Sequence, residues 1–165
     1  MTITQQLAEA LRVPLSKGKY ALIDKKDYRK ISGYKWYIST FGYAVAKVKS
    51  NTIFMHRIIN DTPLGMNTDH INGNKVDNRK NNLRNATDSQ NSFNSYKKGK
   101  KNKYKGVYKT KSGRWAAKIE INYKQKHLGT FDNPECAAKS YNSAAKELHG
   151  RYAKLNVLPE PPKVK

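Results

Sequence analysis

The chain is poor in cysteine, in acidic side chains and in long apolar runs. Its one cysteine, Cys136, excludes an internal disulfide and a cysteine-based zinc site. No apolar run approaches the ~20 residues of a membrane helix, and the N-terminal residues lack the long apolar core of a secretory signal. We therefore expect a soluble, intracellular protein of the cytoplasm, with no membrane partner.

Acidic side chains number 12 against 33 lysines and arginines, which gives a formal net charge of +21. Such an excess favours a nucleic-acid partner, because each neutralised phosphate releases counterions. A ribosomal-type structural protein or a protein of anionic membrane surfaces would carry the same charge, so charge alone does not decide between them. The 165 residues suffice for one ordinary domain or two small ones.

The most informative stretch runs from Asp69 to Asn94 and is rich in asparagine. Asp69 and His70 are adjacent, Asn82 follows twelve residues after His70, and Asn91 lies nine residues further. The oxygens of Asp69 and Asn91 are hard ligands that suit Mg²⁺. Histidine titrates near neutral pH, so His70 suits the role of general base, while Asn82 would fix the loop or orient the imidazole. The alternative is a polar surface loop with an incidental Asp-His pair.

Local signals place these residues on short elements. A long loop is expected from Ile71 to Asn81, because asparagine favours irregular backbone, and a strand is expected at Leu83–Ala86. Thr87 and Gln90 form a capping box, which begins a helix with Asn91 in its first turn.

Residues 1–60 indicate a short helical start followed by short strands. Pro14 ends a helical spacing of apolar residues at Ile3, Leu7 and Leu11. Tyr43–Val48 and Ile53–Met55 are expected to pair antiparallel around a turn at Ser50-Asn51. An aromatic group is assigned to the core of a small sheet in preference to base stacking: Tyr34, Trp36, Tyr37, Phe41 and Tyr43. His56 is assigned a packed structural role in preference to that of a second active-site imidazole.

Residues 97–103 mark a domain boundary, because a dense run of lysines cannot pack into a core. These lysines either track the phosphates of a nucleic acid or belong to a flexible spacer, and both interpretations stay open for Lys97, Lys98, Lys100, Lys101 and Lys103. Residues 157–165 indicate an extended, proline-rich tail.

Residues 104–156 predict a three-stranded antiparallel sheet with one helix on its back. Strands are expected at Tyr104–Lys109, at Arg114–Ile121 and through Leu128, and the second strand alternates between apolar and polar residues. The helix begins with Asn133 as its cap and Pro134 at its first position. Gly150 ends it, and its apolar stripe comprises Ala137, Ala138, Tyr141, Ala145 and Leu148.

Several segments resemble the His-Asn-His (HNH) endonuclease family, especially the phage and intron homing endonucleases with asparagine at the third motif position: Met55–Ile59, Thr68–Asn74, Asp77–Arg79, Asn82–Arg84 and Gln90-Asn91. The resemblance covers roughly residues 20–96, with the motif at 55–94. It implies the ββα-metal fold, with His70 as general base, Asp69 and Asn91 as ligands of one divalent metal, and Asn82 as the middle asparagine rather than Asn81. An asparagine in the third position makes the site harder, which favours Mg²⁺ or Mn²⁺ over Zn²⁺.

Residues 104–156 resemble the Apetala/ethylene-response-factor DNA-binding domain, through Tyr104–Tyr108, Trp115–Ile119, His127–Asp132, Ala137–Tyr141 and Lys154–Asn156. The resemblance implies a sheet that lies in the DNA major groove. It puts six residues on the DNA face: Lys105, Tyr108, Arg114, Lys118, Glu120 and His127. Tyr108 and Thr110 stand where plant members often carry arginine, and His127 stands for a tryptophan, so the target sequence does not carry over. The alternative is a solvated basic sheet face.

We expect an α+β chain with a nuclease domain (1–96), a basic linker (97–103), a DNA-binding domain (104–156) and a tail (157–165). The expected function is metal-dependent, sequence-directed cleavage of double-stranded DNA, of homing type, in a bacterial or phage-infected cell. One site per chain predicts nicking of one strand per binding event, and the chain lacks a heptad run for dimerisation, which predicts a monomer. The alternatives are a non-catalytic DNA-binding transcription regulator with a decayed nuclease half and an RNA-binding module.

Overall fold

The structure, a computed structural model, describes residues 10–95, 103–121 and 124–160. It divides into two compact units, Met1–Asn91 and Ser92–Lys165, which are treated separately below. Most of the predicted linker, Asn122, Tyr123 and the end of the predicted tail lie outside the described residues, whereas Lys103 lies within them and is exposed. Within the described residues, no helix is both long and apolar enough to cross a membrane.

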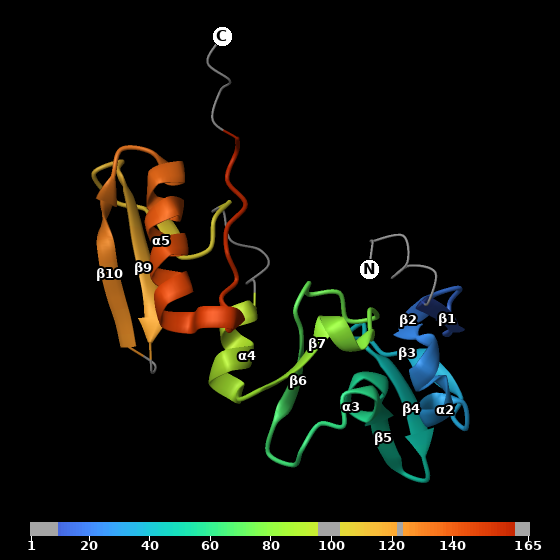
Figure 1. Cartoon of the computed structure of the whole chain (residues 1–165). Coiled ribbons are helices and arrows are strands. Elements are labelled where there is room, and N and C mark those ends of the chain that lie inside the picture. Colours follow the sequence, from blue (N-terminus) through green and yellow to red (C-terminus); the bar gives the residue numbers. More distant parts are fainter. Residues whose placement is uncertain (1–9, 96–102, 122–123, 161–165) are drawn as a thin grey trace. The chain divides into compact units, whose positions relative to one another are not determined.

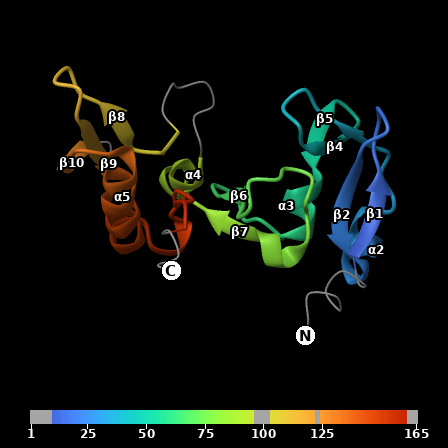
Figure 2. The ribbon, with the colours of Figure 1, turned by 90° about the horizontal axis from the view of Figure 1, so that it is seen from above.

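The first unit consists of small antiparallel sheets and short helices (Figures 1 and 2). A two-stranded sheet contains β1 (Ala10–Pro14) and β2 (Tyr20–Asp24), and a three-stranded sheet contains β3 (Trp36–Ile38), β4 (Ala44–Val48) and β5 (Asn51–Phe54). A hairpin of β6 (Asn67–His70) and β7 (Leu83–Ala86) follows, and then α4 (Asp88–Asn94), which reaches into the second unit. The short helical elements are η1 (Lys25–Asp27), α2 (Tyr28–Ile31), α3 (Met55–Ile59) and η2 (Lys80–Asn82).

The predicted helical start is wrong for the residues that the structure describes, because Ala10–Pro14 form strand β1. Leu11 pairs with Ile23 and Val13 with Ala21. Val13 is buried while its neighbour Arg12 is exposed, which is the period of a strand that covers a core on one face. Pairing with β2 therefore overrides the helical spacing of a few apolar residues.

The predicted hairpin of Tyr43–Val48 and Ile53–Met55 is confirmed in its main part, since β4 and β5 pair antiparallel. Asn51 pairs with Val48 instead of lying in the turn, and Met55 begins α3 instead of ending the strand. Met55 is fully buried in the core of the unit, together with Ile23, Ile31 and Ile59. The core assignment of the aromatic group is right for Trp36, whose Nε1 donates to the Ile31 carbonyl at 2.8 Å. It is wrong for Phe41 and Tyr34, which are 78% and 40% exposed, while Tyr37 and Tyr43 are half-buried.

The second unit confirms a three-stranded antiparallel sheet packed on the C-terminal helix. Its strands β8 (Val107–Lys109), β9 (Trp115–Ile121) and β10 (Lys124–Phe131) lie in the order β10-β9-β8, and α5 (Pro134–His149) lies along the sheet (Figure 1). The η3 turn (Gly150–Tyr152) follows α5. Asn133 caps the helix as predicted, because its Oδ1 accepts from the backbone N–H of Cys136 at 2.8 Å.

Two predicted details of this unit are wrong. The first strand begins at Val107 rather than Tyr104, because Tyr104 is buried beside a turn closed by the Val107 N–H and the Tyr104 carbonyl. On α5, Leu148 is 37% exposed and the neighbouring His149 is buried instead. His149 stacks on Phe93 with ring centroids 3.7 Å apart, and its Nε2 lies 2.9 Å from the Glu120 carbonyl.

Close backbone approach fixes the start of the sheet. Gly106 has φ +74°, and a Cβ at this position would lie 2.1 Å from the Tyr141 ring and 2.6 Å from the Lys118 carbonyl. The side chain of Asn156 accepts from the Lys105 N–H at 2.6 Å and donates to the Lys105 carbonyl at 3.0 Å. Asn156 thus holds the segment that leads into β8 from outside the sheet.

Candidate active site and basic sheet face

The β6-β7 hairpin presents the Asp-His pair. Asp69 pairs with Arg84 and His70 with Leu83, and both members of the pair are only 5% exposed. Because side chains alternate along a strand, Asp69 and His70 leave the hairpin on opposite faces. The two residues therefore have different neighbours and can serve different roles.

An asparagine that sequence reasoning did not assign orients His70. The Nε2 of His70 lies 2.9 Å from the Oδ1 of Asn78, a residue with no exposed surface. The amide nitrogen of Asn78 donates to the Met55 sulfur at 3.3 Å, which fixes the amide so that its oxygen faces the imidazole. Nε2 is then the protonated nitrogen, and Nδ1 is the nitrogen that can accept a proton.

Burial lowers the pKa of His70, and the Asn78 hydrogen bond and the Asp69 charge oppose this effect. The imidazole is therefore neutral at neutral pH, which is the form that accepts a proton from water.

His56 lies against His70, with ring centroids 5.1 Å apart in an edge-to-face arrangement. Burial, followed by the influence of His70, lowers the pKa of His56 to about 3. Its Nδ1 has no hydrogen-bond partner among the described residues. His56 also contacts the rings of Tyr43 and Phe54. It is therefore a packed, uncharged side chain beside the candidate base.

Asn82 holds the loop between the two strands. Its Oδ1 accepts from the Asn72 N–H at 3.0 Å, and its Nδ2 donates to the Asp77 carbonyl at 2.7 Å. Of the two roles considered for Asn82, these contacts correspond to fixing the loop. The neighbouring Asn81 is exposed.

Strand β2 supports the same loop from the other side. Leu22 donates its N–H to the Val76 carbonyl at 2.8 Å and accepts from the Asn78 N–H at 2.7 Å. Asp77 between them accepts from the Arg79 guanidinium at 2.7 and 2.8 Å. Burial alone would raise the pKa of Asp77, but the hydrogen bond and charge of Arg79 lower it overall.

Arg84 binds the Asp69 carboxylate, with Nε and Nη2 at 2.8 and 2.6 Å from Oδ2. Sequence reasoning missed this ion pair, although the hairpin register places the two residues opposite each other. Arg84 thus binds one oxygen of the Asp69 carboxylate through two nitrogens from the opposite strand.

The helix with Asn91 begins as predicted. Thr87 and Gln90 form the reciprocal capping box, at 3.0 and 3.2 Å, and the exposed Asn91 lies in the first turn of α4. The hairpin thus carries Asp69 and His70 on opposite faces, and Asn82 lies directly before β7. The functional roles of these residues and of Asn91 stay predictions.

The donor chemistry fits a hard divalent cation rather than zinc. Within residues 10–95, 103–121 and 124–160, no group of three or more His, Cys, Asp or Glu side chains could hold a metal. Asp69 and Asn91 supply oxygen only, and a cation such as Mg²⁺ keeps several waters and substrate oxygens in its coordination sphere. Two protein ligands are consistent with that preference.

The register of the second sheet puts most of the predicted DNA-contacting residues on one face. Tyr108 pairs with Ala116, Lys118 with His127, and Glu120 with Gln125. The opposite face holds Ala117 and Ile119, which pack in the cores beneath α5. The Lys118 ammonium donates to Gln125 at 2.8 Å and lies 5.1 Å from the centre of the Tyr108 ring.

The two other predicted DNA contacts, Arg114 and Lys105, already have partners within the protein. Arg114 pairs with the exposed Asp132 at 3.0 Å. Lys105 donates to the carbonyls of Phe93 and Ser95 at 2.5 and 2.8 Å. Burial, followed by the charge of Lys154, lowers the pKa of Lys105 to about 8. Lys105 is therefore a structural cation in this conformation, and contact with a phosphate would require it to leave these carbonyls.

The first unit thus carries an oriented histidine on a hairpin, and the second unit carries a three-stranded sheet with Arg114 and Lys118 on its outer face. An uncharacterized HNH endonuclease of Acanthamoeba polyphaga mimivirus is 35% identical over 148 residues, which are 86% of this chain and 77% of the mimivirus protein. The chain therefore belongs to the HNH endonuclease family.

The chain is also similar to plant proteins with an AP2/ERF domain. An ethylene-responsive transcription factor of Arabidopsis thaliana is 49% identical over 59 residues, which are 34% of this chain and 32% of that protein. An AP2/ERF and B3 domain-containing transcription repressor of the same plant is 44% identical over 54 residues, or 33% of this chain and 15% of the repressor. The chain thus spans a third or less of these plant relatives. No family profile and no solved structure matches the chain.

Proposed function

We propose that this protein is a metal-dependent, sequence-directed DNA endonuclease of homing type that nicks one strand of double-stranded DNA per binding event. The observation that carries the proposal is the 2.9 Å contact of His70 with the buried Asn78, in a member of the HNH family. A histidine held in one tautomer is pre-organised for proton transfer. An incidental surface histidine would not need a buried amide to orient it.

In the proposed reaction, Nδ1 of His70 takes one proton from a water molecule. The water oxygen bonds to phosphorus as the bond from phosphorus to the 3′ oxygen breaks. The 3′ oxygen takes up a proton from solvent water, and the imidazolium of His70 then releases its proton to solvent. The products are a 5′-phosphate and a 3′-hydroxyl. Asn78 holds the imidazole during the transfer, while Asn82 and Asp77 keep the loop that carries Asn78 in place.

The proposed nuclease module is a ββα-metal unit made of β6, β7 and α4. Asp69 and Asn91 would hold one divalent cation, Mg²⁺ or Mn²⁺, which when bound stabilises the developing charge on the phosphate and the leaving oxygen. Arg84 holds the Asp69 carboxylate in a fixed direction through its two hydrogen bonds. A single such site suits one phosphodiester, which supports nicking by a monomer.

The proposed DNA face is the polar side of β8, β9 and β10. Lys118 and Arg114 suit phosphates or guanine edges, and Glu120 suits the amino group of cytosine. Tyr108 and His127 complete the face. The lysines of residues 97–103 and Lys105 would follow the phosphate backbone.

A supercoiled plasmid tests the proposal under single-turnover conditions. Protein with Mg²⁺ should convert it to the open circle, and protein with EDTA should leave it intact. Equal cleavage in EDTA and Mg²⁺ would refute the metal mechanism, and linear product without an open-circle intermediate, from a stable dimer, would refute nicking by a monomer.

The ligand role of Asn91 has its own test. Asn91→Ala should lose activity in Mg²⁺ and regain part of it at raised Mn²⁺, because loss of one neutral ligand weakens metal binding only partly. Asp69→Ala should lose activity that Mn²⁺ does not restore, since it removes the charged ligand. Wild-type activity of Asn91→Ala in Mg²⁺ would contradict the assignment.

The similarity to plant transcription factors favours one rival, a DNA-binding regulator that does not cut. The rival predicts specific binding of duplex DNA without cleavage in either Mg²⁺ or Mn²⁺. The rival function gives no role to the buried hydrogen bond between His70 and Asn78.

A further inference from the structure

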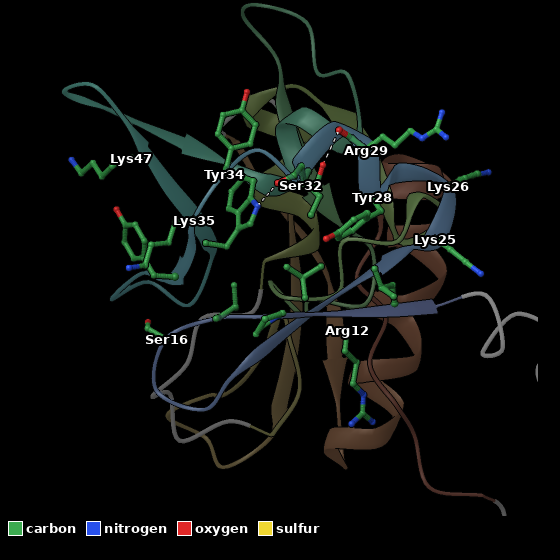
Figure 3. A pocket seen from close by; sticks show the side chains of 17 residues that line it. Arg12, Ser16, Lys25, Lys26, Tyr28, Arg29, Ser32, Tyr34, Lys35 and Lys47 are labelled. Carbon is green, nitrogen blue, oxygen red and sulfur yellow. Dashed lines mark hydrogen bonds between the residues drawn. The ribbon is translucent and has the colours of Figure 1, made fainter.

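The first unit has a hollow of about 1300 Å³ that the proposed nuclease site does not use. Elements β1, η1, α2, β3 and β4 supply its lining, and Figure 3 shows it from close by. None of its lining residues belongs to the hairpin that carries the candidate base.

Cations surround this hollow. Figure 3 shows Lys35 and Lys47 on one side, Lys25, Lys26 and Arg29 on the other, and Arg12 below. These six residues form the rim, and no aspartate or glutamate is among the described lining residues. In the described part of the chain no rim cation forms a salt bridge, whereas the nearby Lys30, outside the rim, pairs with Asp61 at 2.6 Å. The rim therefore presents uncompensated positive charge, which fits a polyanion.

Tyrosine rings form part of the floor. Tyr28 is 46% exposed and Tyr34 is 40% exposed, although both line the hollow. Trp36 is buried, its Nε1 donates to the Ile31 carbonyl, and its ring lies edge-on to that of Tyr34 with centroids 5.7 Å apart. Tyr34 is thus supported by a fixed ring and keeps exposed surface.

We propose that this hollow binds an unpaired stretch of DNA, with bases on the rings of Tyr28 and Tyr34 and phosphates at the rim cations. A basic groove with aromatic rings is the arrangement that binds single strands without sequence preference. The faces of paired bases are covered by neighbouring bases in a duplex, whereas the strand end released at a nick can present them to an aromatic ring. Only the choice of DNA over RNA as the ligand rests on the proposed function. The proposed stacking and phosphate contacts do not depend on that function.

The stacking part is tested with a short oligothymidylate, the full chain and no metal. Tyr28→Ala and Tyr34→Ala should each weaken binding about fivefold or more, because stacking on an aromatic ring contributes about 1–3 kcal/mol per base. Tyr28→Phe and Tyr34→Phe keep the ring and should bind as the wild type does. Phe41→Ala is the matched control, since Phe41 is an aromatic residue that is 78% exposed and lies outside the lining.

The rim is tested by salt dependence. The triple variant Lys25→Ala, Lys26→Ala, Arg29→Ala should reduce the slope of log affinity against log salt by about 2, because each phosphate contact to a single strand contributes about 0.7. A triple control outside the lining, Lys17→Ala, Lys19→Ala, Lys49→Ala, should change the slope little. Thermal unfolding and circular dichroism of each variant verify the fold.

Three outcomes would overturn the proposal: wild-type affinity of the tyrosine-to-alanine variants, equal losses for single strand and for duplex of the same length, or stronger binding of oligouridylate than of oligothymidylate. Cleavage is not measured in this experiment. Failure of the nuclease assignment would therefore leave its result unchanged.

Discussion

The two units bury different kinds of side chain. Among the described residues, eight buried polar or charged side chains lie in the first unit and three in the second. In the first unit they include the candidate base and the residues that hold its loop. In the second unit the interior between sheet and helix is formed mainly by alanine and tyrosine, and the charged residues of the sheet lie on the outer face.

The two kinds of interior suit the two functions that we propose, proton transfer in the first unit and DNA binding in the second. Under the proposed function, proton transfer needs a histidine that is desolvated and held in one tautomer. Hydrogen bonds hold most of the buried polar groups of the first unit, while Nδ1 of His56 and Oδ2 of Asp27 have no such partner among the described residues. Recognition of a polyanion needs exposed charge on a rigid support, which an apolar sheet-helix interior supplies. We therefore expect substitutions inside the first unit to reduce catalysis, and substitutions inside the second unit to reduce stability and DNA affinity.

The largest expected effect on stability is that of Gly106→Ala. The added Cβ would meet the Tyr141 ring and the Lys118 carbonyl, and the backbone has φ +74°. Overpacking and a left-handed alanine together should destabilise the second unit by about 3 kcal/mol or more. In a Trp36→Phe background, Trp115 fluorescence reports unfolding of this unit alone.

Gly113→Ala is the matched control, because Gly113 also has positive φ but faces open space. It should cost only about 1 kcal/mol. Equal stability losses for the two variants would show that the close approach at Gly106 is unimportant.

An intermediate effect is expected for Asn78→Ala, which removes the group that orients His70. Turnover should fall about 10–100-fold, from the loss of a buried hydrogen bond to the base. Duplex affinity should stay the same, because it depends on phosphate contacts elsewhere. A plasmid-nicking rate and a gel shift on the same preparations measure both quantities, together with the pH profile of cleavage.

Asn81→Ala is the control for this position, since Asn81 is exposed. It should cleave at the wild-type rate. If Asn78→Ala cleaves with an unchanged rate and pH profile, Asn78 has only a packing role.

The smallest expected effect is a pH dependence at Lys105. Burial lowers the pKa of Lys105 to about 8 from its ordinary 10.5, so the folded chain loses this proton more easily than the unfolded chain. The stability of the second unit should rise with pH between these two values, relative to Lys105→Met. Thermal unfolding at several pH values measures the difference in slope, and Lys103→Met, at an exposed position, should follow the wild type. A parallel course of wild type and Lys105→Met would contradict the burial of this charge.

The sequence predicted the elements whose signals are local. The strand Leu83–Ala86, the capping box at Thr87 and the cap at Asn133 each depend on neighbouring residues, and each lies where it was expected. The alternation of β9 also identified its two faces, because a strand with one buried face leaves a clear period.

Features that depend on distant contacts could not be predicted in this way. β1 forms because β2 pairs with it, and Asn78 orients His70 because Leu22, far away in sequence, holds its backbone. Asn78 lies in an asparagine-rich stretch, and no local sequence signal indicated that Asn78 rather than Asn82 would orient His70. The buried His149 likewise depends on stacking against Phe93.

The most direct test of the central claim separates cutting from binding in one variant. His70→Ala, assayed beside the wild type with Mg²⁺, should lose nicking of supercoiled plasmid while its duplex affinity in a gel shift stays nearly unchanged, because the base acts on water and affinity comes from phosphate contacts. Wild-type cleavage by His70→Ala would contradict the assignment of His70 as the general base.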